Sequence, residues 1–330
     1  MRIAILGAGA WGSALAISLS ARHQINLWTK DSDHATEMQR EQTNRRFLPD
    51  FALSKSIQIT SVLSEALDDA ELTLVVVPIV GFRDTLRSVL ECKPELPVLW
   101  GCKGFELETC YLPHQIVNQV YAERFLSCGV LSGPSFAEEV ARGLPTALTL
   151  ASTEADFAQV IASELHHSRL RIYTSDDVIG VETGGAIKNV ITIAAGISDG
   201  IGFGHNARAA LITRGLMEIT RLGLSLGGDM KTFMGLAGLG DLILTCTGDL
   251  SRNRQVGLML AEGKTLDEIL RELGHVAEGV YTARSALELG MRLHVDMPIT
   301  KAVCSILNEE ISAREAVEVL LNREQKSEIY

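Results

Sequence analysis

The sequence predicts an α/β fold in which a doubly wound, mostly parallel sheet is followed by an all-helical C-terminal half. Over the first half, short β-branched runs alternate with helix-like stretches, which is typical of a sheet covered by helices on both faces. After Val178 the strand patterns fade and helical periodicity continues to the C-terminus. We therefore expect two domains, residues 1–180 and 181–330.

The individual elements follow from the same patterns. Strands are expected at residues 2–6, 25–28, 72–77, 97–101, 129–133, 146–150 and 170–175. In the second half, helices are expected at residues 186–197, 207–223, 251–262, 265–273, 279–291, 298–308 and 313–322. Because no Pro/Ser-rich linker separates the halves, we expect them to share a tight interface.

Composition narrows the class of protein. The chain has 330 residues and a formal net charge of −11, which argues against a partner that is a nucleic-acid backbone or an anionic membrane surface. A local basic pocket could still bind a small anion. The six cysteines show no C-x-x-C spacing and no clustered histidines, so we expect reduced thiols and no metal site. The patterns predict no membrane insertion and a cytoplasmic location.

A glycine-rich turn directly follows the first strand. Residues 7–12, "GAGAWG", have the form G-x-G-x-x-G and open a helix. In this context Gly7 permits a tight turn, Gly9 lets the backbone approach a pyrophosphate, and Gly12 lets helix and strand pack closely. The pyrophosphate would lie at the helix N-terminus, where free N–H groups favour anions. The motif predicts a Rossmann-type domain that binds NAD or NADP.

The choice between the two cofactors depends on the end of the second strand, "INLWTKD". An acidic residue about 20 positions after the fingerprint binds the ribose 2′-hydroxyl of NAD. Here Asp31 could accept from that hydroxyl, whereas Lys30 could pair with the 2′-phosphate of NADP. Arg45 and Arg46 are further possible partners of the phosphate. The sequence leaves both cofactors open.

Polar residues also follow later strands, where ligands of open α/β sheets collect. Lys103 lies just past a strand in "VLWGCKGFE", and Gly133 and Ser135 lie at a strand-to-helix turn in "VLSGPSFAEE". For Lys103 the alternative is a solvated loop lysine. Ser135 with Glu138 also fits a capping box, S-x-x-E, which would give the serine a purely local role.

The second half contributes "GLAGLGDLILTCTGDLSRNRQVG". Asp241 follows its glycine-rich turn, and Ser251, Arg252 and Asn253 open a helix. Hydroxyl, guanidinium and amide donors at a helix start suit a phosphate group. The alternative is that Ser251 is only an N-cap and Arg252 only a surface cation.

Lys188 stands near the start of the apolar helix expected at 186–197, in "GGAIKNV". Burial and the positive end of the helix dipole both disfavour an ammonium, so we expect its pKa to fall toward the working pH, where proton transfer is efficient. Gly184 and Gly185 are expected to leave room for substrate, and Asn189 to orient a neighbouring group. The alternative is a lysine that snorkels to the surface.

These motifs occur in one order along almost the whole chain, together with "FLP" at 47–49, "GIGFGHNARAALITRG" and "EG" at 278–279. The combination resembles the bacterial-type NAD(P)-dependent glycerol-3-phosphate dehydrogenases. Two departures from the family pattern lie at and just after the first motif: Ala10 stands where the family often has serine, and Ser13 where it often has threonine. From Ala10 we therefore expect only backbone contacts.

The resemblance implies reversible hydride transfer between sn-glycerol 3-phosphate and dihydroxyacetone phosphate, with NAD or NADP, feeding phospholipid biosynthesis. It also implies a helical domain like that of the 6-phosphogluconate dehydrogenase group and a homodimer. Carried over by position, Lys188 is the acid/base, with Lys103 and Asp241 beside it. The implied substrate-binding residues are Lys103, Gly133, Ser135, Lys188, Asp241, Ser251, Arg252 and Asn253. The implied cofactor-binding residues are Gly7, Gly9, Ala10, Trp11, Gly12, Lys30, Lys103, Ala137, Arg252, Val276 and Glu278.

Two other functions compete. A related hydroxyacid or 6-phosphogluconate-type dehydrogenase would share the cofactor domain and a lysine base but would need a carboxylate-binding set. A non-catalytic dinucleotide sensor would keep "GAGAWG" but would have no need of Lys103, Lys188 and Asp241 together.

Overall fold

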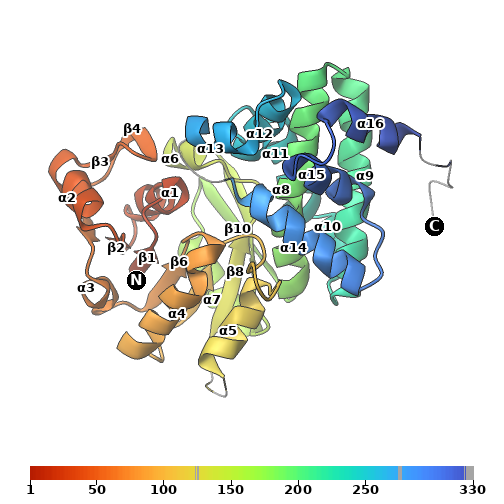
Figure 1. Ribbon diagram of the computed structural model, residues 1–330. Coiled ribbons are helices and arrows are strands. Elements are labelled where there is room, and N and C mark those ends of the chain that lie inside the picture. Colours follow the sequence, from red (N-terminus) through yellow and green to blue (C-terminus); the bar gives the residue numbers. More distant parts are fainter. Residues whose placement is uncertain (123, 125, 274–276, 323, 325–330) are drawn as a thin grey trace.

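A computed structural model describes residues 1–122, 124, 126–273, 277–322 and 324. The N-terminal half is built around an eight-stranded sheet, and the C-terminal half is a group of helices beside it (Figure 1). The strand order is β10-β9-β8-β7-β6-β1-β2-β5. Every neighbouring pair is parallel except β8 with β9. The predicted α/β class and mostly parallel sheet are confirmed.

All seven expected strands are present. The sheet consists of β1 (Arg2–Leu6), β2 (Gln24–Trp28), β5 (Ile57–Thr60), β6 (Leu72–Val75), β7 (Val98–Trp100), β8 (Cys128–Ser132), β9 (Thr146–Ala151) and β10 (Leu170–Ser175). The sequence interpretation missed β5 and the small hairpin of β3 (Thr43–Asn44) and β4 (Leu48–Ala52). These strands are short and lie at or outside the sheet edge, so they lack the continuous apolar run that marks the central strands.

Helices cover both faces of the sheet because successive strand residues point to opposite sides. In β1, Ile3 and Ile5 join the cluster on one face, and Ala4 and Leu6 join the cluster on the other. The first face is covered by α1 (Ala10–Leu19), α2 (Ser32–Glu41) and α7 (Ala155–Leu165). The second is covered by α3 (Leu63–Leu67), α4 (Ile79–Cys92) and α5 (Pro113–Tyr121). The short α6 (Ala137–Ala141) packs beside α1.

The C-terminal half surrounds one long helix, α8 (Val178–Ile201). Around it lie α9 (Gly204–Ser225), α10 (Met230–Phe233), the π-helix η1 (Leu236–Gly240), α11 (Asp241–Thr247), α12 (Arg252–Ala261), α13 (Leu266–Leu273), α14 (Glu278–Arg292), α15 (Pro298–Leu307) and α16 (Ala313–Leu321). The expected start of the central helix at residue 186 was wrong. Asp177 caps the helix eight residues earlier by accepting from the Gly180 backbone N–H at 2.7 Å.

Among the described residues, α8 is the one unbroken helix that is long and apolar enough to cross a membrane, and 89% of its apolar window is buried inside the protein. It is therefore the core of the helical half. Val178 and Val181 of α8 pack in the same apolar cluster as Trp100 of β7 and Ile116 of α5, so the two halves share a close interface. The division into residues 1–180 and 181–330 stays a prediction, with the last strand ending at Ser175.

Candidate active site

Lys103, Lys188 and Asp241 meet at the junction of the two halves. Lys103 follows β7, Lys188 lies on α8, and Asp241 is the first residue of α11. Lys103 Nζ donates to Asp241 Oδ2 at 2.8 Å, and Lys188 Nζ donates to Asp241 Oδ1. Lys188 Nζ also donates to Thr245 Oγ1 at 3.0 Å. Residues that are 53 and 138 positions apart in the chain thus form one buried cluster.

The electrostatics of this cluster suit proton transfer. Burial lowers the pKa of Lys188 to about 8, although the Asp241 carboxylate opposes the shift. Burial alone would raise the pKa of Asp241, but the two ammonium groups hold it below its ordinary value. Two cations share one carboxylate, which leaves a net positive charge in a region of low dielectric. Such a site can stabilise a developing alkoxide.

The helix dipole does not contribute as the sequence suggested. Because α8 begins at Val178, Lys188 lies ten residues beyond its start, and the dipole effect is confined to about the first turn. Burial is the first cause of the lowered pKa. Snorkelling is also wrong for Lys188, since its side chain is only 8% exposed.

Gly184 and Gly185 bring protein segments together, and the expected room for substrate is filled by protein atoms. A Cβ on Gly184 would lie 2.7 Å from the carbonyl oxygen of Ala237, so glycine allows η1 to pack against α8. A Cβ on Gly185 would lie 3.1 Å from Ser132 Oγ and 3.6 Å from the aliphatic stem of Lys103. These contacts place Asp241 and Lys103 beside the lysine of α8.

Ser251, Arg252 and Asn253 lie at the start of α12 as expected. Ser251 Oγ accepts from the Arg254 N–H at 3.3 Å, so the serine does act as the N-cap, and Asn253 Oδ1 accepts from the Gly279 N–H at 3.0 Å. The Arg252 side chain is exposed. Its positive charge acts on the Glu278 carboxylate, and so do those of Lys103 and Lys188. The start of α12 and the lysine cluster therefore both lie near Glu278.

The β8–α6 turn has the predicted place but a different local structure. Gly133 has φ +137°, a conformation that favours glycine. Ser135 Oγ donates to the Gly133 carbonyl at 3.1 Å, and α6 begins at Ala137 with Phe136 as its N-cap. The alternative interpretation, a capping box between Ser135 and Glu138, is wrong, because the helix starts too late for Ser135 to cap it.

The glycine-rich turn fits a dinucleotide. Gly7 has φ +119°, and a Cβ there would lie 2.9 Å from the backbone of Val76. A Cβ on Gly12 would lie 1.9 Å from the Gly7 carbonyl oxygen, so these two positions need glycine for packing. A Cβ on Gly9 would meet nothing within 4 Å. Open space therefore lies over Gly9, the residue before α1, where a pyrophosphate could approach the helix N-terminus.

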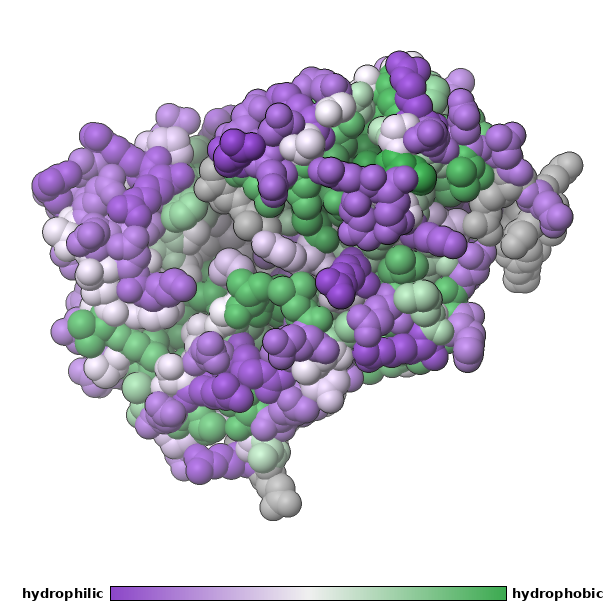
Figure 2. All heavy atoms as spheres, in the orientation of Figure 1, coloured by the Kyte–Doolittle hydropathy of each residue, from purple (hydrophilic) through white to green (hydrophobic). Residues whose placement is uncertain are grey.

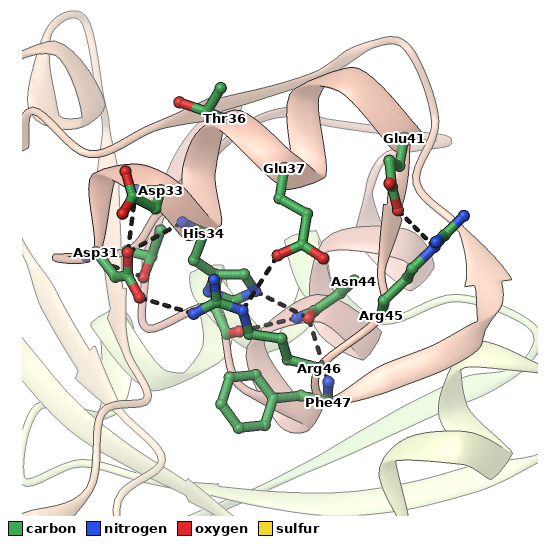
Figure 3. Close-up of polar contacts among 12 residues, drawn as sticks. Asp31, Asp33, His34, Thr36, Glu37, Glu41, Asn44, Arg45, Arg46 and Phe47 are labelled. Atoms are coloured by element: carbon green, nitrogen blue, oxygen red, sulfur yellow. Dashed lines mark hydrogen bonds and ion pairs between the residues drawn. The ribbon is translucent and has the colours of Figure 1, made fainter.

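Asn44 supports this turn from beneath, and the sequence interpretation missed it. The fully buried Asn44 donates to the Ala8 carbonyl at 2.9 Å and to Ser13 Oγ at 2.7 Å. Its Oδ1 lies 3.0 Å from His34 Nε2 of α2 (Figure 3). The Ala8 carbonyl can only accept, so the amide nitrogen of Asn44 faces it and the amide oxygen faces His34. His34 Nε2 is therefore the donor in the bond between these two side chains. A lone asparagine before "RRFLP" was the only sequence signal.

The charged residues near α2 are largely engaged with one another. Asp31 caps α2 by accepting from the Asp33 and His34 N–H groups, and its other oxygen pairs with Arg46 at 2.8 Å (Figure 3). Arg45 pairs with Glu41. The Lys30 side chain is exposed.

Two other expected cofactor residues lie elsewhere. Trp11 lies at the start of α1 with its ring nitrogen facing Gly101, and Val276 lies outside the described residues.

Comparison with known proteins agrees with this geometry. Residues 2–158 match the family described as NAD-dependent glycerol-3-phosphate dehydrogenase N-terminus, and residues 177–318 match its C-terminus. A relative from Nitrosospira multiformis, named glycerol-3-phosphate dehydrogenase [NAD(P)+], is 60% identical over 100% of both chains. A relative of the same name from Nitrosomonas eutropha is 61% identical over 99% of each.

Solved structures give the same result. The crystal structure of glycerol-3-phosphate dehydrogenase from Coxiella burnetii superposes with a TM-score of 0.94 at 42% identity, covering 98% of this chain and 99% of that one. A D-mandelate dehydrogenase in complex with NADH, at 16% identity and a TM-score of 0.63, shares the fold alone. This chain belongs to the NAD-dependent glycerol-3-phosphate dehydrogenase family.

Proposed function

We propose that this member of the glycerol-3-phosphate dehydrogenase family interconverts sn-glycerol 3-phosphate and dihydroxyacetone phosphate with Lys188 as its proton-transfer residue. The enzyme is an oxidoreductase that uses NAD or NADP, and the bound dinucleotide accepts or supplies the hydride. The observation that carries the residue assignment is the buried Lys188–Asp241–Lys103 cluster next to a turn shaped for a dinucleotide.

Oxidation of the secondary alcohol requires a base. With a pKa of about 8, the Lys188 amine is partly neutral near neutral pH and can take the hydroxyl proton. The ammonium of Lys103 then stabilises the negative charge on the substrate oxygen, and Asp241 holds both lysines in place. In the reverse direction the Lys188 ammonium returns the proton to the same oxygen.

The substrate phosphate is assigned to the start of α12. Arg252 is exposed and charged at the first turn of that helix, where a planar guanidinium can bind two phosphate oxygens. Ser251 and Asn253 use their side-chain oxygens to fix the helix start and the neighbouring α14. Their contribution to phosphate binding therefore comes from the Ser251 hydroxyl hydrogen, which is still free to be donated, and from the backbone N–H and amide nitrogen of Asn253, whereas the Ser251 N–H donates to the Gly248 carbonyl at 3.2 Å. Gly133 and Ser135 complete the proposed substrate site.

The cofactor assignments continue from the turn. Gly7, Gly9 and Gly12 shape the pyrophosphate site, and Lys30 lies exposed beyond β2, where it would meet the 2′-phosphate of NADP. The remaining proposed cofactor residues are Ala10, Trp11, Lys103, Ala137, Arg252, Val276 and Glu278. We further assign to this chain a cytoplasmic location, a homodimeric state and a role in supplying phospholipid biosynthesis, all on its family membership.

The test is the loss of NADH or NADPH absorbance when dihydroxyacetone phosphate is added to the purified protein. Rapid, substrate-dependent oxidation of either cofactor supports the proposal. Turnover of 6-phosphogluconate in place of glycerol 3-phosphate would favour the related dehydrogenase. Nucleotide binding with no turnover of either substrate would favour the sensor.

A further inference from the structure

One buried carboxylate takes no part in the mechanism described above. Glu182 lies on α8 and is 4% exposed. Its Oε1 accepts from Trp100 Nε1 at 2.7 Å and from the His114 backbone N–H at 2.9 Å, and its Oε2 lies 2.5 Å from His114 Nδ1. Burial raises the pKa of Glu182, against the effect of these hydrogen bonds. Burying such a group is costly unless its partners are held in place.

The partners come from the other half of the molecule. Trp100 ends β7, three residues before Lys103, and His114 lies in the first turn of α5. Glu182 therefore joins the strand that leads into Lys103 to the helix that carries Lys188.

Two further contacts continue along α8 at intervals of one turn. Gly185 packs against the stem of Lys103, 3.6 Å from the position of a Cβ. One turn later, Lys188 shares the Asp241 carboxylate with Lys103. The residues after β7 thus contact α8 along its length from Glu182 to Lys188. The Glu182 hydrogen bonds fix the beginning of this contact.

We infer that Glu182 is a positioning residue, which fixes the chain around Lys103 against α8 and so sets the placement of the two lysine ammonium groups around Asp241. It acts through Trp100 and His114 and does not touch substrate. A misplacement of about 1 Å in an active site can cost about 100-fold in rate. The inference rests on the proposed function, because the two lysines matter only if they act on the substrate.

Glu218 supplies a matched control. It is also a buried carboxylate with three hydrogen bonds, accepting from the backbone N–H groups of Ile299 and Thr300 and from Thr300 Oγ1. It joins α9 to α15, two helices that carry none of the proposed site residues. Loss of either carboxylate leaves three donors without an acceptor, so both losses should destabilise the fold.

The experiment compares Glu182→Leu, Glu182→Gln and Glu218→Leu by Tm, by kcat per folded enzyme and by dinucleotide Kd. Glu182→Leu should lower kcat by about 10- to 100-fold while the dinucleotide Kd changes by less than about threefold. Glu182→Gln keeps an amide oxygen for Trp100 and the His114 N–H, and its NH2 can donate to the other tautomer of His114. It should therefore restore most of kcat. Glu218→Leu should lower Tm and leave kcat unchanged.

A double-mutant cycle tests whether Glu182 acts through Trp100. Trp100→Phe should lower kcat by a smaller factor, and Trp100→Phe combined with Glu182→Leu should be no worse than Glu182→Leu alone. If Glu182→Leu does not fold, the kcat values of Trp100→Phe and Glu182→Gln test the inference in its place. A normal kcat for Trp100→Phe would then overturn the inference.

Other results would also overturn it: an unchanged kcat in Glu182→Leu, an equal loss in Glu182→Gln and Glu182→Leu, or an equal loss in Glu218→Leu. A wild-type protein without activity on dihydroxyacetone phosphate would instead overturn the proposed function. Wild-type activity together with any of these variant results would overturn only the role of Glu182.

Discussion

The cofactor turn and the lysine cluster achieve their chemistry in different ways. The turn at residues 7–12 depends on backbone conformation, with Gly7 at φ +119° and open space over Gly9. The cluster depends on charged side chains that come from the loop after β7, from α8 and from α11, and that become close only in the folded protein. The glycine turn is formed by consecutive residues, whereas the lysine cluster forms only when distant segments pack together. Substitutions in the turn should therefore change mainly the dinucleotide Kd, and substitutions in the cluster should change mainly kcat.

On the face shown in Figure 2, apolar patches lie beside the hollow between the two halves, and polar residues cover most of the rest. A small phosphorylated substrate gains little from apolar contact, so its binding energy must come from a few charged groups.

The largest effect is expected from Lys188→Ala. This variant should fold and bind the dinucleotide but lose about 10²- to 10⁴-fold or more in turnover, because it removes the proton-transfer group. Steady-state kinetics with dihydroxyacetone phosphate, together with a dinucleotide Kd, measures both quantities. Near-normal turnover would show that Lys188 is not the acid/base.

Arg252→Ala should cost about 2–4 kcal/mol in kcat/KM, since it removes one charge-assisted phosphate partner. Arg252→Lys should recover only part, because an ammonium lacks the planar fork. Unphosphorylated dihydroxyacetone, a poor substrate, should be almost indifferent to either change. Dinucleotide affinity must be measured separately because Arg252 is also a proposed cofactor residue. Equal losses on both substrates would remove the phosphate assignment.

Asn44→Ala should act on the cofactor turn and not on the chemistry. The substitution leaves the Ala8 carbonyl, Ser13 Oγ and His34 Nε2 without their shared partner. We expect dinucleotide Kd to rise roughly tenfold, using the 1–3 kcal/mol cost of an unsatisfied buried group. At saturating cofactor, kcat should stay near normal. A large loss of kcat at saturation would mean that the two regions are not separable.

The pH dependence of the reduction follows from the lowered pKa of Lys188. Below about 8 the lysine is protonated and can donate, and above it the neutral amine cannot. The kcat for reduction should thus be level at lower pH and fall by about tenfold per unit well above the pKa. Oxidation should show the opposite trend, rising with pH and becoming level above the same value. A reduction rate that increases from pH 8 to 9 would contradict the assignment.

The smallest effect is expected from Lys30→Ala. If Lys30 binds the 2′-phosphate, its loss should raise the KM for NADPH by a few-fold, as for one exposed charge pair, and leave the KM for NADH unchanged. Asp31, which already pairs with Arg46 at 2.8 Å, is the competing determinant. Equal effects on both cofactors would show that Lys30 does not distinguish them.

The sequence by itself determined what depends on neighbouring residues. The seven expected strands, the glycine turn and the helical C-terminal half follow from patterns and backbone rules that act over a few positions. The expectation that Lys188 is special also came from local evidence, an ammonium in an apolar helix. Of the two causes expected to lower its pKa, burial and the helix dipole, the second was wrong. The helix α8 begins at Val178, after the Asp177 cap, and this start lies before the apolar run from which the helix was predicted.

Tertiary structure decided everything that joins distant segments. Asp241 binds lysines 53 and 138 positions away, and η1 reaches α8 only because Gly184 has no side chain. Asn44 and Glu182 are ordinary polar residues until folding buries them among fixed donors and acceptors. Their importance comes from the high cost of burying a polar group without partners, and only the packed structure specifies which groups are buried and which partners they meet.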